Sequence, residues 1–251
     1  MGRLLIRADD LGYSKAINYG IYEAVHNGII NNVGLMVNMP MTQQGLDLLK
    51  AENIDLGLHT VISSGKPLMN ADQVKSITTD TGTFKASKDY RTAAVDFVDL
   101  DEVIVEIEAQ YQKFVQLTGR RPDYFEGHAV MSDNFVKGLQ IVARRHNVPF
   151  LNFAFGDVAV KFKNTLLRAL MESTQPDYDP YMTFKKGIAR SDNNDELPMM
   201  ICHPGYLDNY ILQHSSLTIP RTKEVAMLCD PAIKKLIKDE SIQLVRYSEL
   251  K

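Results

Sequence analysis

Acidic and histidine side chains stand at the ends of four strand-like runs of this sequence. Two aspartates directly follow the first apolar run, and single histidines close the third run, the fourth run and a late one. In a parallel α/β barrel the carboxyl ends of all strands open onto one face, and that face carries the active site. The two carboxylates and three imidazoles are therefore expected to converge in one basin. These residues are Asp9, Asp10, His59, His128 and His203.

This set of side chains suits metal-assisted hydrolysis. Carboxylate and neutral imidazole bind zinc and other divalent first-row ions, and three protein ligands with one open position define a catalytic site. One aspartate with two histidines meets that description. Such an ion lowers the pKa of a bound water toward about 7 and polarises a carbonyl oxygen. The second carboxylate can act as general base and the remaining histidine as proton donor to an amine. The set therefore matches hydrolysis of an amide or ester, and it suggests neither redox chemistry nor phosphoryl transfer.

Each of these residues also has an ordinary structural interpretation. An acidic pair after a strand commonly caps a helix or lies in a solvated turn, and a histidine in a strand commonly forms a hydrogen bond in the core. His203 precedes Pro204-Gly205, a pair typical of a turn. The coincidence of all five at strand ends favours a shared site over these separate interpretations. The other histidines, expected in a helix, at a helix end and in a loop, are His26, His146 and His214.

Short strand-like runs alternate along the chain with longer helix-like runs. Strands are expected at 3–8, 32–38, 54–62, 124–128, 148–155, 197–203 and 242–247. Helices are expected at 14–28, through Leu46 to Leu49, at 101–117, at 134–146 and at 220–238 with an interruption at Pro231. A further helix is expected near 163–171, followed by one or two irregular strands, and the polar stretch 70–88 is expected to cross the barrel mouth as a long loop.

Repeated β-α units predict a parallel sheet with helices outside. The predicted fold is a single-domain, TIM-like (β/α) barrel over residues 1–251, distorted and with seven or eight parallel strands. The G-x-G-x-x-G turn of a dinucleotide-binding fold is missing after the first strand, which weakens the alternative of an open, doubly wound sheet.

Composition narrows the classes of partner and location. With 251 residues, 45% of them apolar and 24% charged, the chain suits one large domain with a sizeable core. The net charge of −3, with scattered Lys and Arg, does not predict a nucleic-acid partner. No run of about 18 apolar residues predicts a membrane span, and the opening MGRLLIRADD does not resemble a signal peptide. The two cysteines, Cys202 and Cys229, form no C-x-x-C pair, so a reduced, cytoplasmic protein is expected.

Four segments of the chain resemble the YdjC-like carbohydrate deacetylase family, whose best-known members are chitooligosaccharide deacetylases. These segments are RLLIRADDLGYSKAINYGI, GLHTVISSGKPL, RRPDYFEGH and MMICHPGYLDN. The resemblance runs in register from residue 4 to about residue 250. Its most specific parts are the A-D-D-x-G opening and the C-H-P-G-Y segment with the following D-N. Each motif is modest alone, but four in the right order are specific.

The resemblance implies a barrel-like α/β fold, a bound divalent ion and a homodimer. Matched position by position, Asp10, His59 and His128 correspond to the metal ligands, Asp9 to the catalytic base and His203 to the proton donor for the leaving sugar amine. The implied activity is that of a carbohydrate N-deacetylase, a hydrolase that removes an acetyl group from a small N-acetylglucosamine-containing sugar such as a chitooligosaccharide. Two imidazoles favour zinc, whereas the family is often described with magnesium, so the expected ion is Mg²⁺ or Zn²⁺.

The chain departs from the family at the fourth strand. Family members commonly carry D-S-H-x-H-V-H there, and residues 126–132 of this chain are EGHAVMS. The first histidine of the run, His128, is present, whereas Val130 and Ser132 stand where later histidines are usual. The expected metal ligand is therefore kept, and the replacements are expected to change the pocket around it and so the substrate or the activity.

Other residues near the predicted site have two interpretations each. Arg221 is interpreted as a surface arginine at a helix start, with orientation of Asp9 or capture of an anion as the alternative. Tyr13, Tyr206 and Tyr210 are candidates for stacking on a sugar, since the chain has no tryptophan, or for ordinary packing.

Two further functions stay open at this point: a metal hydrolase of another amide or ester, and a non-catalytic carbohydrate-binding relative. Retention of both Asp9 and His203 argues against the second, because a binding protein needs neither a base nor an acid.

Overall fold

The strands of this computed structural model, which describes residues 1–152, 158–193 and 195–251, form one curled and mostly parallel sheet. Along the sheet the order is β4-β3-β2-β1-β7-β6-β5, and β8 pairs with β1. The strands are β1 (Arg3–Leu11), β2 (Asn32–Leu35), β3 (Asp55–Thr60), β4 (Phe125–Gly127), β5 (Ala159–Phe162), β6 (Thr165–Leu170), β7 (Leu197–Cys202) and β8 (Gln243–Val245).

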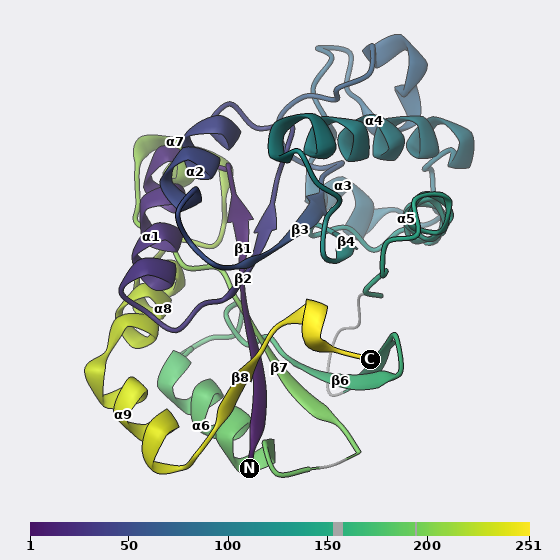
Figure 1. Cartoon of the computed structure of the whole chain (residues 1–251). Coiled ribbons are helices and arrows are strands. Elements are labelled where there is room, and N and C mark those ends of the chain that lie inside the picture. The colour runs from purple at the N-terminus through teal and green to yellow at the C-terminus, as the bar shows by residue number, and fades with distance from the viewer. Residues whose placement is uncertain (153–157, 194) are drawn as a thin grey trace.

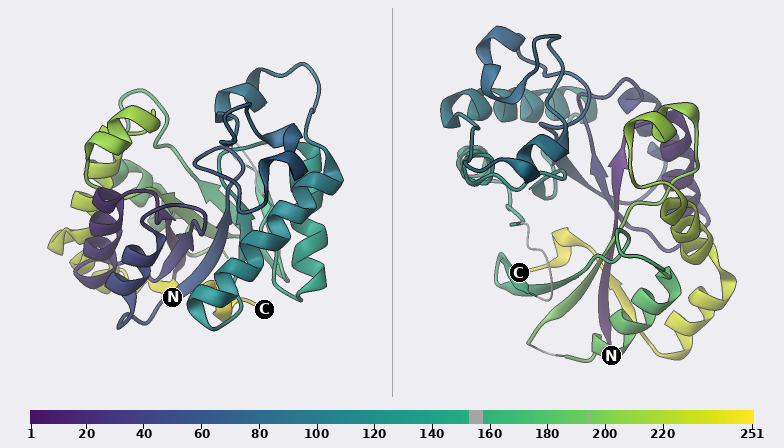
Figure 2. Two further views of the ribbon diagram at one scale, coloured as in Figure 1. Left: turned by 90° about the horizontal axis from the view of Figure 1, so that it is seen from above. Right: turned by 180° about the vertical axis from the view of Figure 1, so that it is seen from behind.

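Helices cover the outside of the curled sheet. In Figure 1 one group, α1, α2, α6, α8 and α9, lies to one side of the strands, and α4 and α5 lie on the other side; the view from above in Figure 2 shows the strands between the two groups. The bounds are α1 (Lys15–His26), α2 (Thr42–Leu49), α3 (Ser87–Thr92), α4 (Leu100–Thr118), α5 (Asp133–Arg145), α6 (Pro180–Arg190), α7 (Asn209–His214), α8 (Ile219–Cys229) and α9 (Pro231–Asp239), with short 3₁₀ turns at Ala71–Gln73, Lys75–Ile77 and Tyr247–Glu249. No helix among the described residues is long and apolar enough to cross a bilayer.

The predicted α/β barrel-like fold is confirmed, with one strand in the opposite direction. Every described strand pair is parallel except β5 with β6, which form an antiparallel hairpin. Within the described residues the strand order ends at β4 and β5, which do not pair with each other, so the barrel is open between them. A single parallel bridge from Phe125 to Phe150 extends the sheet slightly beyond β4.

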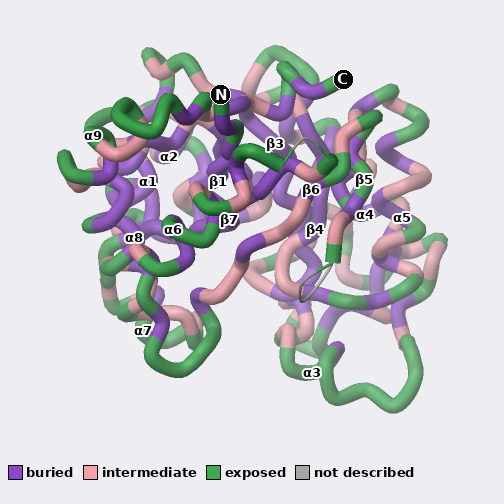
Figure 3. Tube along the Cα trace, turned by 90° about the horizontal axis from the view of Figure 1, so that it is seen from below, coloured by how far each residue is buried: buried purple, intermediate pink, exposed green. Residues whose placement is uncertain are grey.

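Alternation along the strands separates two cores. Successive side chains of a strand point to opposite faces, and in β1 Leu4, Ile6 and Ala8 pack in the larger core between sheet and helices. Leu5 belongs instead to a smaller core enclosed by the curl of the sheet. Strands β1, β2, β3 and β7 are accordingly buried along most of their length. Strands β5 and β6, near the edge of the sheet, also have half-buried and exposed positions, as Figure 3 shows. The inner members from the strands, including the adjoining Tyr124 and Tyr247, are Leu5, Tyr124, Val160, Phe162, Leu167, Leu197, Met199, Ile201, Val245 and Tyr247.

β1 contains one extra residue near its carboxyl end. Ala8 pairs with Val33 and Leu11 pairs with Leu35, so three steps along β1 match two steps along β2. One extra residue in one of two paired strands defines a β-bulge, which bends the strand and changes the direction of a side chain. Asp10 lies in the bulge with φ of 79°, a left-handed conformation that aspartate adopts more readily than most residues.

Side-chain caps determine where several helices begin. Ser14 accepts a hydrogen bond from the backbone N of Ile17 at the start of α1 (3.2 Å). Ser132 accepts one from the backbone N of Phe135 at the start of α5 (3.1 Å) and donates to Asp96. His128 lies in the short segment between the end of β4 and this cap.

Two predictions about the middle of the chain are wrong. The helix expected near 163–171 is strand β6, and a helix, α6, follows where irregular strands were expected. A short apolar run does not distinguish strand from helix by period alone, and here pairing with both β5 and β7 decides for a strand.

The strand expected at 148–155 is reduced, among its described residues 148–152, to the bridge at Phe150; the remainder lies outside the described residues. The stretch 70–88 has more local structure than the expected loop, because it holds two 3₁₀ turns and the bridge from Thr78 to Phe84.

Candidate metal centre

Strand alternation places a polar layer above the inner core. In β1 the inward positions after Leu5 are Arg7 and Asp9, and in β7 the inward series of Leu197, Met199 and Ile201 leads to His203. The inner core fills the amino-terminal part of the curl, so the polar side chains collect at the carboxyl ends of the strands. This is the face at which the five candidate residues were predicted to converge.

Asp10, His59 and His128 point their ligand atoms at one another. Asp10 Oδ1 lies 3.3 Å from His59 Nε2 and 3.2 Å from His128 Nδ1, and the two ring nitrogens are 2.9 Å apart. Asp10 Oδ1 is buried, and its contacts with the two imidazoles do not have the geometry of hydrogen bonds. One carboxylate and two imidazoles in this arrangement form a group that could hold a metal ion, and this donor set fits a divalent first-row ion.

Glu126 sets the orientation of the His59 ring. Its Oε1 is hydrogen-bonded to His59 Nδ1, and both side chains are almost fully buried. A carboxylate behind a histidine fixes the tautomer and aims the other ring nitrogen; here that nitrogen is Nε2, which faces Asp10. Burial would raise the pKa of Glu126, but Arg7 and His59 outweigh it and hold that pKa below its ordinary value.

Arg7 joins Glu126 to Asp9. Its Nη2 donates to Asp9 Oδ2 (2.8 Å) and to Glu126 Oε2 (3.0 Å). Burial raises the pKa of Asp9 to about 7, an effect that the Arg7 guanidinium partly offsets. The other oxygen, Asp9 Oδ1, is buried without a hydrogen-bond partner.

Gly34 makes this close approach possible. A Cβ atom at Gly34 would lie 2.9 Å from Asp9 Oδ1 and 3.3 Å from His59 Cβ. Since β2 lies between β1 and β3, a side chain at this position would separate Asp9 from His59.

Arg221 is buried, so its interpretation as a surface arginine is wrong. It is 2% exposed, and its Nη2 donates to Asp10 Oδ2 at 2.7 Å. It does not pair with Asp9, which Arg7 binds instead. Burial would raise the pKa of Asp10, but Arg221 and then His128 outweigh it and hold that pKa well below its ordinary value. Asp10 is therefore ionised at neutral pH, as a metal ligand must be.

His203 is held by its backbone, and its ring faces the same pocket. The backbone N of His203 donates to Glu224 Oε2 (2.6 Å), and Tyr178 Oη donates to Glu224 Oε1 (2.8 Å). The ring Nδ1 is buried without a hydrogen-bond partner. Burial lowers the pKa of His203 to about 3, although the nearby Asp10 opposes that effect.

The five candidate residues line one cavity of about 260 Å³. One wall comes from the segments after β3 and around α3, and the facing wall comes from the segment after α7. In Figure 3 the helices that belong to these walls, α3 and α7, lie at the end of the molecule opposite the amino terminus. Wall residues include Ser63, Ser64, Ala86, Ser87, Arg91, His214, Ser215, Ser216 and Leu217.

Only one of the three tyrosine candidates lines this cavity. Tyr13 is 4% exposed, donates from Oη to the carbonyl of His214 (3.1 Å) and meets His128 edge-on. Tyr206 and Tyr210 are not among the lining residues. The two departures from the family pattern also lie away from the lining: Val130 is buried, and Ser132 caps α5.

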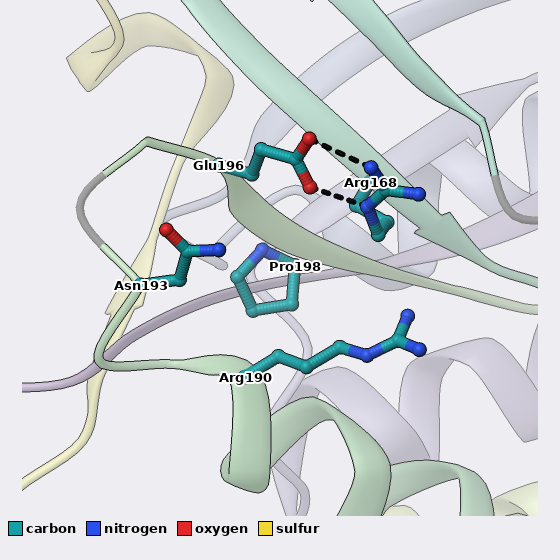
Figure 4. Close-up of a pocket in the computed structure, with 5 residues that line it drawn as sticks. All are labelled: Arg168, Arg190, Asn193, Glu196 and Pro198. Atoms are coloured by element: carbon teal, nitrogen blue, oxygen red, sulfur yellow. Dashed lines mark hydrogen bonds and ion pairs between the residues drawn. The ribbon is translucent and has the colours of Figure 1, made fainter.

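A second cavity, of about 210 Å³, lies near the amino end of β7, whereas His203 follows its carboxyl end. Figure 4 shows that it is lined by Arg168, Arg190, Asn193, Glu196 and Pro198, with Arg168 and Glu196 joined by two hydrogen bonds. Since that glutamate already pairs with an arginine, this cavity does not offer the donor set of the first.

Sequence reasoning missed Arg7, Glu126 and Glu224. The first two are charged residues at inward positions of strands, and that signal was available: an ionisable side chain inside a barrel needs a charged partner. Glu224 lies on α8, where nothing in the local pattern marks it as buried.

Fold and cavity together define a class of protein: a mostly parallel, barrel-like α/β protein with an aspartate and two histidines gathered at the carboxyl ends of its strands. Within that class, the chain belongs to the family of YdjC-like proteins, whose model matches residues 3–239.

Two relatives with descriptive names are similar to this chain over nearly their whole length. The chain is 30% identical to a carbohydrate deacetylase of Clostridium beijerinckii, covering 99% of this chain and 100% of the relative. It is 28% identical to a chitooligosaccharide deacetylase of Serratia marcescens, covering 98% of each.

Solved structures support the fold. A protein of Enterococcus faecalis V583 superposes with a TM-score of 0.81 at 23% identity, covering 98% of this chain and 97% of that one. A family 4 carbohydrate esterase of Streptomyces lividans, solved with acetate, gives 0.54 at 11% identity, covering 97% and 91%.

Proposed function

We propose that this protein is a metal-dependent carbohydrate N-deacetylase, which removes the acetyl group from a small N-acetylglucosamine-containing sugar such as a chitooligosaccharide. The observation that carries the proposal is a set of four buried polar atoms without hydrogen-bond partners on residues that line one pocket: Asp9 Oδ1, Asp10 Oδ1, Ser63 Oγ and His203 Nδ1. Orphaned buried polar atoms are costly, so their concentration in one pocket indicates groups kept for a ligand. The curated relatives supply the reaction class, because their names describe carbohydrate deacetylases.

In this proposal Asp10, His59 and His128 hold one divalent ion. When bound, the ion supplies a Lewis acid for the amide carbonyl and for the attacking water. Asp9 is the general base: Arg7 holds Oδ2, so the unpartnered Oδ1 is free to accept the proton of that water. His203 is the general acid, which gives a proton to the departing sugar amine. Because burial keeps its ring neutral, His203 must gain that proton within the catalytic cycle. Two imidazole ligands favour zinc over magnesium, and elemental analysis of the purified protein identifies the ion.

Acetate release from N-acetylated mono- and disaccharides, with and without a chelator, tests the proposal. We expect release that chelation abolishes and added ion restores. His59→Ala and His128→Ala should each lose both the ion and the activity, whereas His26→Ala, which removes a surface histidine, should lose neither. Bound metal without acetate from any sugar would support a different amide or ester substrate or a non-catalytic protein instead.

Three broader predictions accompany this function. They are a cytoplasmic location, a homodimer and a single domain over residues 1–251. Cell fractionation, light scattering of the purified protein and limited proteolysis measure these three properties separately.

A further inference from the structure

A buried arginine lies inside a second acidic group beside the candidate metal centre. Arg7 is 1% exposed, and its Nη2 contacts Asp9 Oδ2 at 2.8 Å and Glu126 Oε2 at 3.0 Å. The side chains of both carboxylates are 2% exposed. The proposed reaction gives this guanidinium no direct contact with substrate, yet two residues next to the reaction depend on it for their charge balance.

The group around Arg7 has the donors of a cation site. Ligand atoms of Asp9, His59 and Glu126 lie within 4.8 Å of one another, as do those of Asp10, His59 and His128. Two carboxylates and an imidazole suit a divalent cation. His59 belongs to both groups, because its Nδ1 meets Glu126 and its Nε2 faces Asp10. The two groups are therefore adjacent, and nothing in their donor chemistry alone selects one over the other.

Arg7 distinguishes the two groups. A single nitrogen, Nη2, binds one oxygen from each carboxylate of the second group, where a cation would otherwise bridge them. Burial would lower the pKa of Arg7, but Asp9 and then Glu126 outweigh it and hold that pKa above its ordinary value. A guanidinium does not give up its proton in proteins, so this positive charge is permanent. Asp10 instead pairs with Arg221 through Oδ2 only, which leaves Oδ1 facing the two imidazoles.

We propose that Arg7 is a positioning residue that serves as a built-in cation of the second acidic group. It excludes a second divalent ion, keeps Asp9 out of the coordination of the ion at Asp10, and supports Glu126 behind His59. This inference rests on the proposed metal centre. It explains why the adjacent aspartates have different roles. Arg7 binds Asp9 and Arg221 binds Asp10, but only Arg7 occupies the position that a metal ion would take.

Counting Co²⁺ ions bound per chain tests the proposal without any activity measurement. Co²⁺ serves as the probe because its visible absorption reports the ligands around it, and elemental analysis after dialysis gives the count. We expect the wild type to saturate at one ion. Arg7→Met, which keeps a similar length but removes the charge, should bind two ions and change the absorption of the bound Co²⁺. Arg7→Lys should return to one ion, because it restores the charge.

Two controls separate this role from general damage to the barrel. Arg3→Met removes an exposed arginine of the same strand and should leave one ion. Arg7→Met combined with Glu126→Gln removes one of the two carboxylates as well as the arginine, and it should lose the second ion. If Arg7→Met does not fold, Arg7→Gln, which stays polar but uncharged, is expected to bind the second ion in its place.

The inference is overturned if folded Arg7→Met binds one ion with the wild-type absorption, or if the wild type itself binds two. A wild type that binds no Co²⁺, Zn²⁺ or Mg²⁺ would instead refute the metal centre on which the proposed function rests. Failure of the inference and failure of the function therefore give different results.

Discussion

Replacing Glu224 by glutamine should change how the stability of this protein depends on pH. Burial raises the pKa of Glu224 from 4.5 to about 7 in the folded protein, against the hydrogen bonds from the His203 backbone and Tyr178. Below about pH 4.5 the carboxyl is protonated in both the folded and unfolded states. Between about pH 4.5 and 7 the unfolded chain releases the proton while the folded protein keeps it, so the free energy of unfolding falls as pH rises. Above about pH 7 the contribution is constant.

The size of this effect follows from the two pKa values. At about 1.4 kcal/mol per pH unit, the interval from 4.5 to about 7 corresponds to about 3 kcal/mol. Glutamine is neutral throughout and can keep both contacts, since its carbonyl accepts from the His203 N and its NH₂ donates to Tyr178 Oη. Relative to the wild type, Glu224→Gln should therefore gain about 3 kcal/mol between pH 4.5 and 7.

Urea unfolding at several pH values between 4.5 and 8 measures this difference. Subtracting the wild type from the variant cancels groups that both contain, including Asp9. Glu240→Gln, at an exposed position after α9, is the matched control, and its difference from the wild type should stay flat. A flat difference for Glu224→Gln as well, or one that falls with pH, would refute the assignment of a buried, protonated glutamate.

Three other substitutions have expected outcomes. Asp9→Asn should keep the ion and lose turnover by roughly 10²–10⁴-fold, measured by acetate release and metal content; loss of the ion would reverse the roles of Asp9 and Asp10. Gly34→Ala should cost about 1–3 kcal/mol of stability by overpacking and lower turnover, since its Cβ would lie 2.9 Å from Asp9 Oδ1. Thermal melting measures the loss of stability and steady-state kinetics measure turnover. An unchanged rate would contradict the close packing of Gly34 against Asp9. Ser132→Ala should cost about 1 kcal/mol through loss of the α5 cap, measured by urea unfolding, and no cost would mean that Asp96 alone orders that turn.

Convergence of the five candidate residues was predictable because parallel strands deliver their carboxyl ends to one face. The chemistry-bearing residues lie far apart along the chain, but each follows an apolar run that is clear in the sequence. β6 was not predictable in the same way, since its six residues owe their strand conformation to pairing with neighbours that the local pattern does not reveal. The antiparallel direction of β5 has the same cause.

Pairing among buried charges was the least predictable part of the site. Sequence reasoning offered Asp9 as a partner for Arg221, whereas the structure joins Arg221 to Asp10 and gives Asp9 to Arg7. Which carboxylate each arginine binds depends on distances of a few ångströms between neighbouring strands. It also depends on residues far apart in the sequence, because Arg221 on α8 binds Asp10, more than 200 residues away. Strand alternation could have flagged Arg7 and Glu126 as inward-facing, but not which carboxylate each would meet.

The bulge in β1 makes the acidic pair depend on residue count as well as residue type. In a regular strand two neighbouring side chains point to opposite faces, so only the surplus position between Ala8 and Leu11 lets Asp9 and Asp10 share the pocket. Deleting a single amino acid there would restore even pairing with β2 and turn one carboxylate toward the helices. Deletion of one codon in this short stretch should therefore abolish the activity of the pocket and leave the barrel folded. A set of amino-acid substitutions alone would not produce this effect.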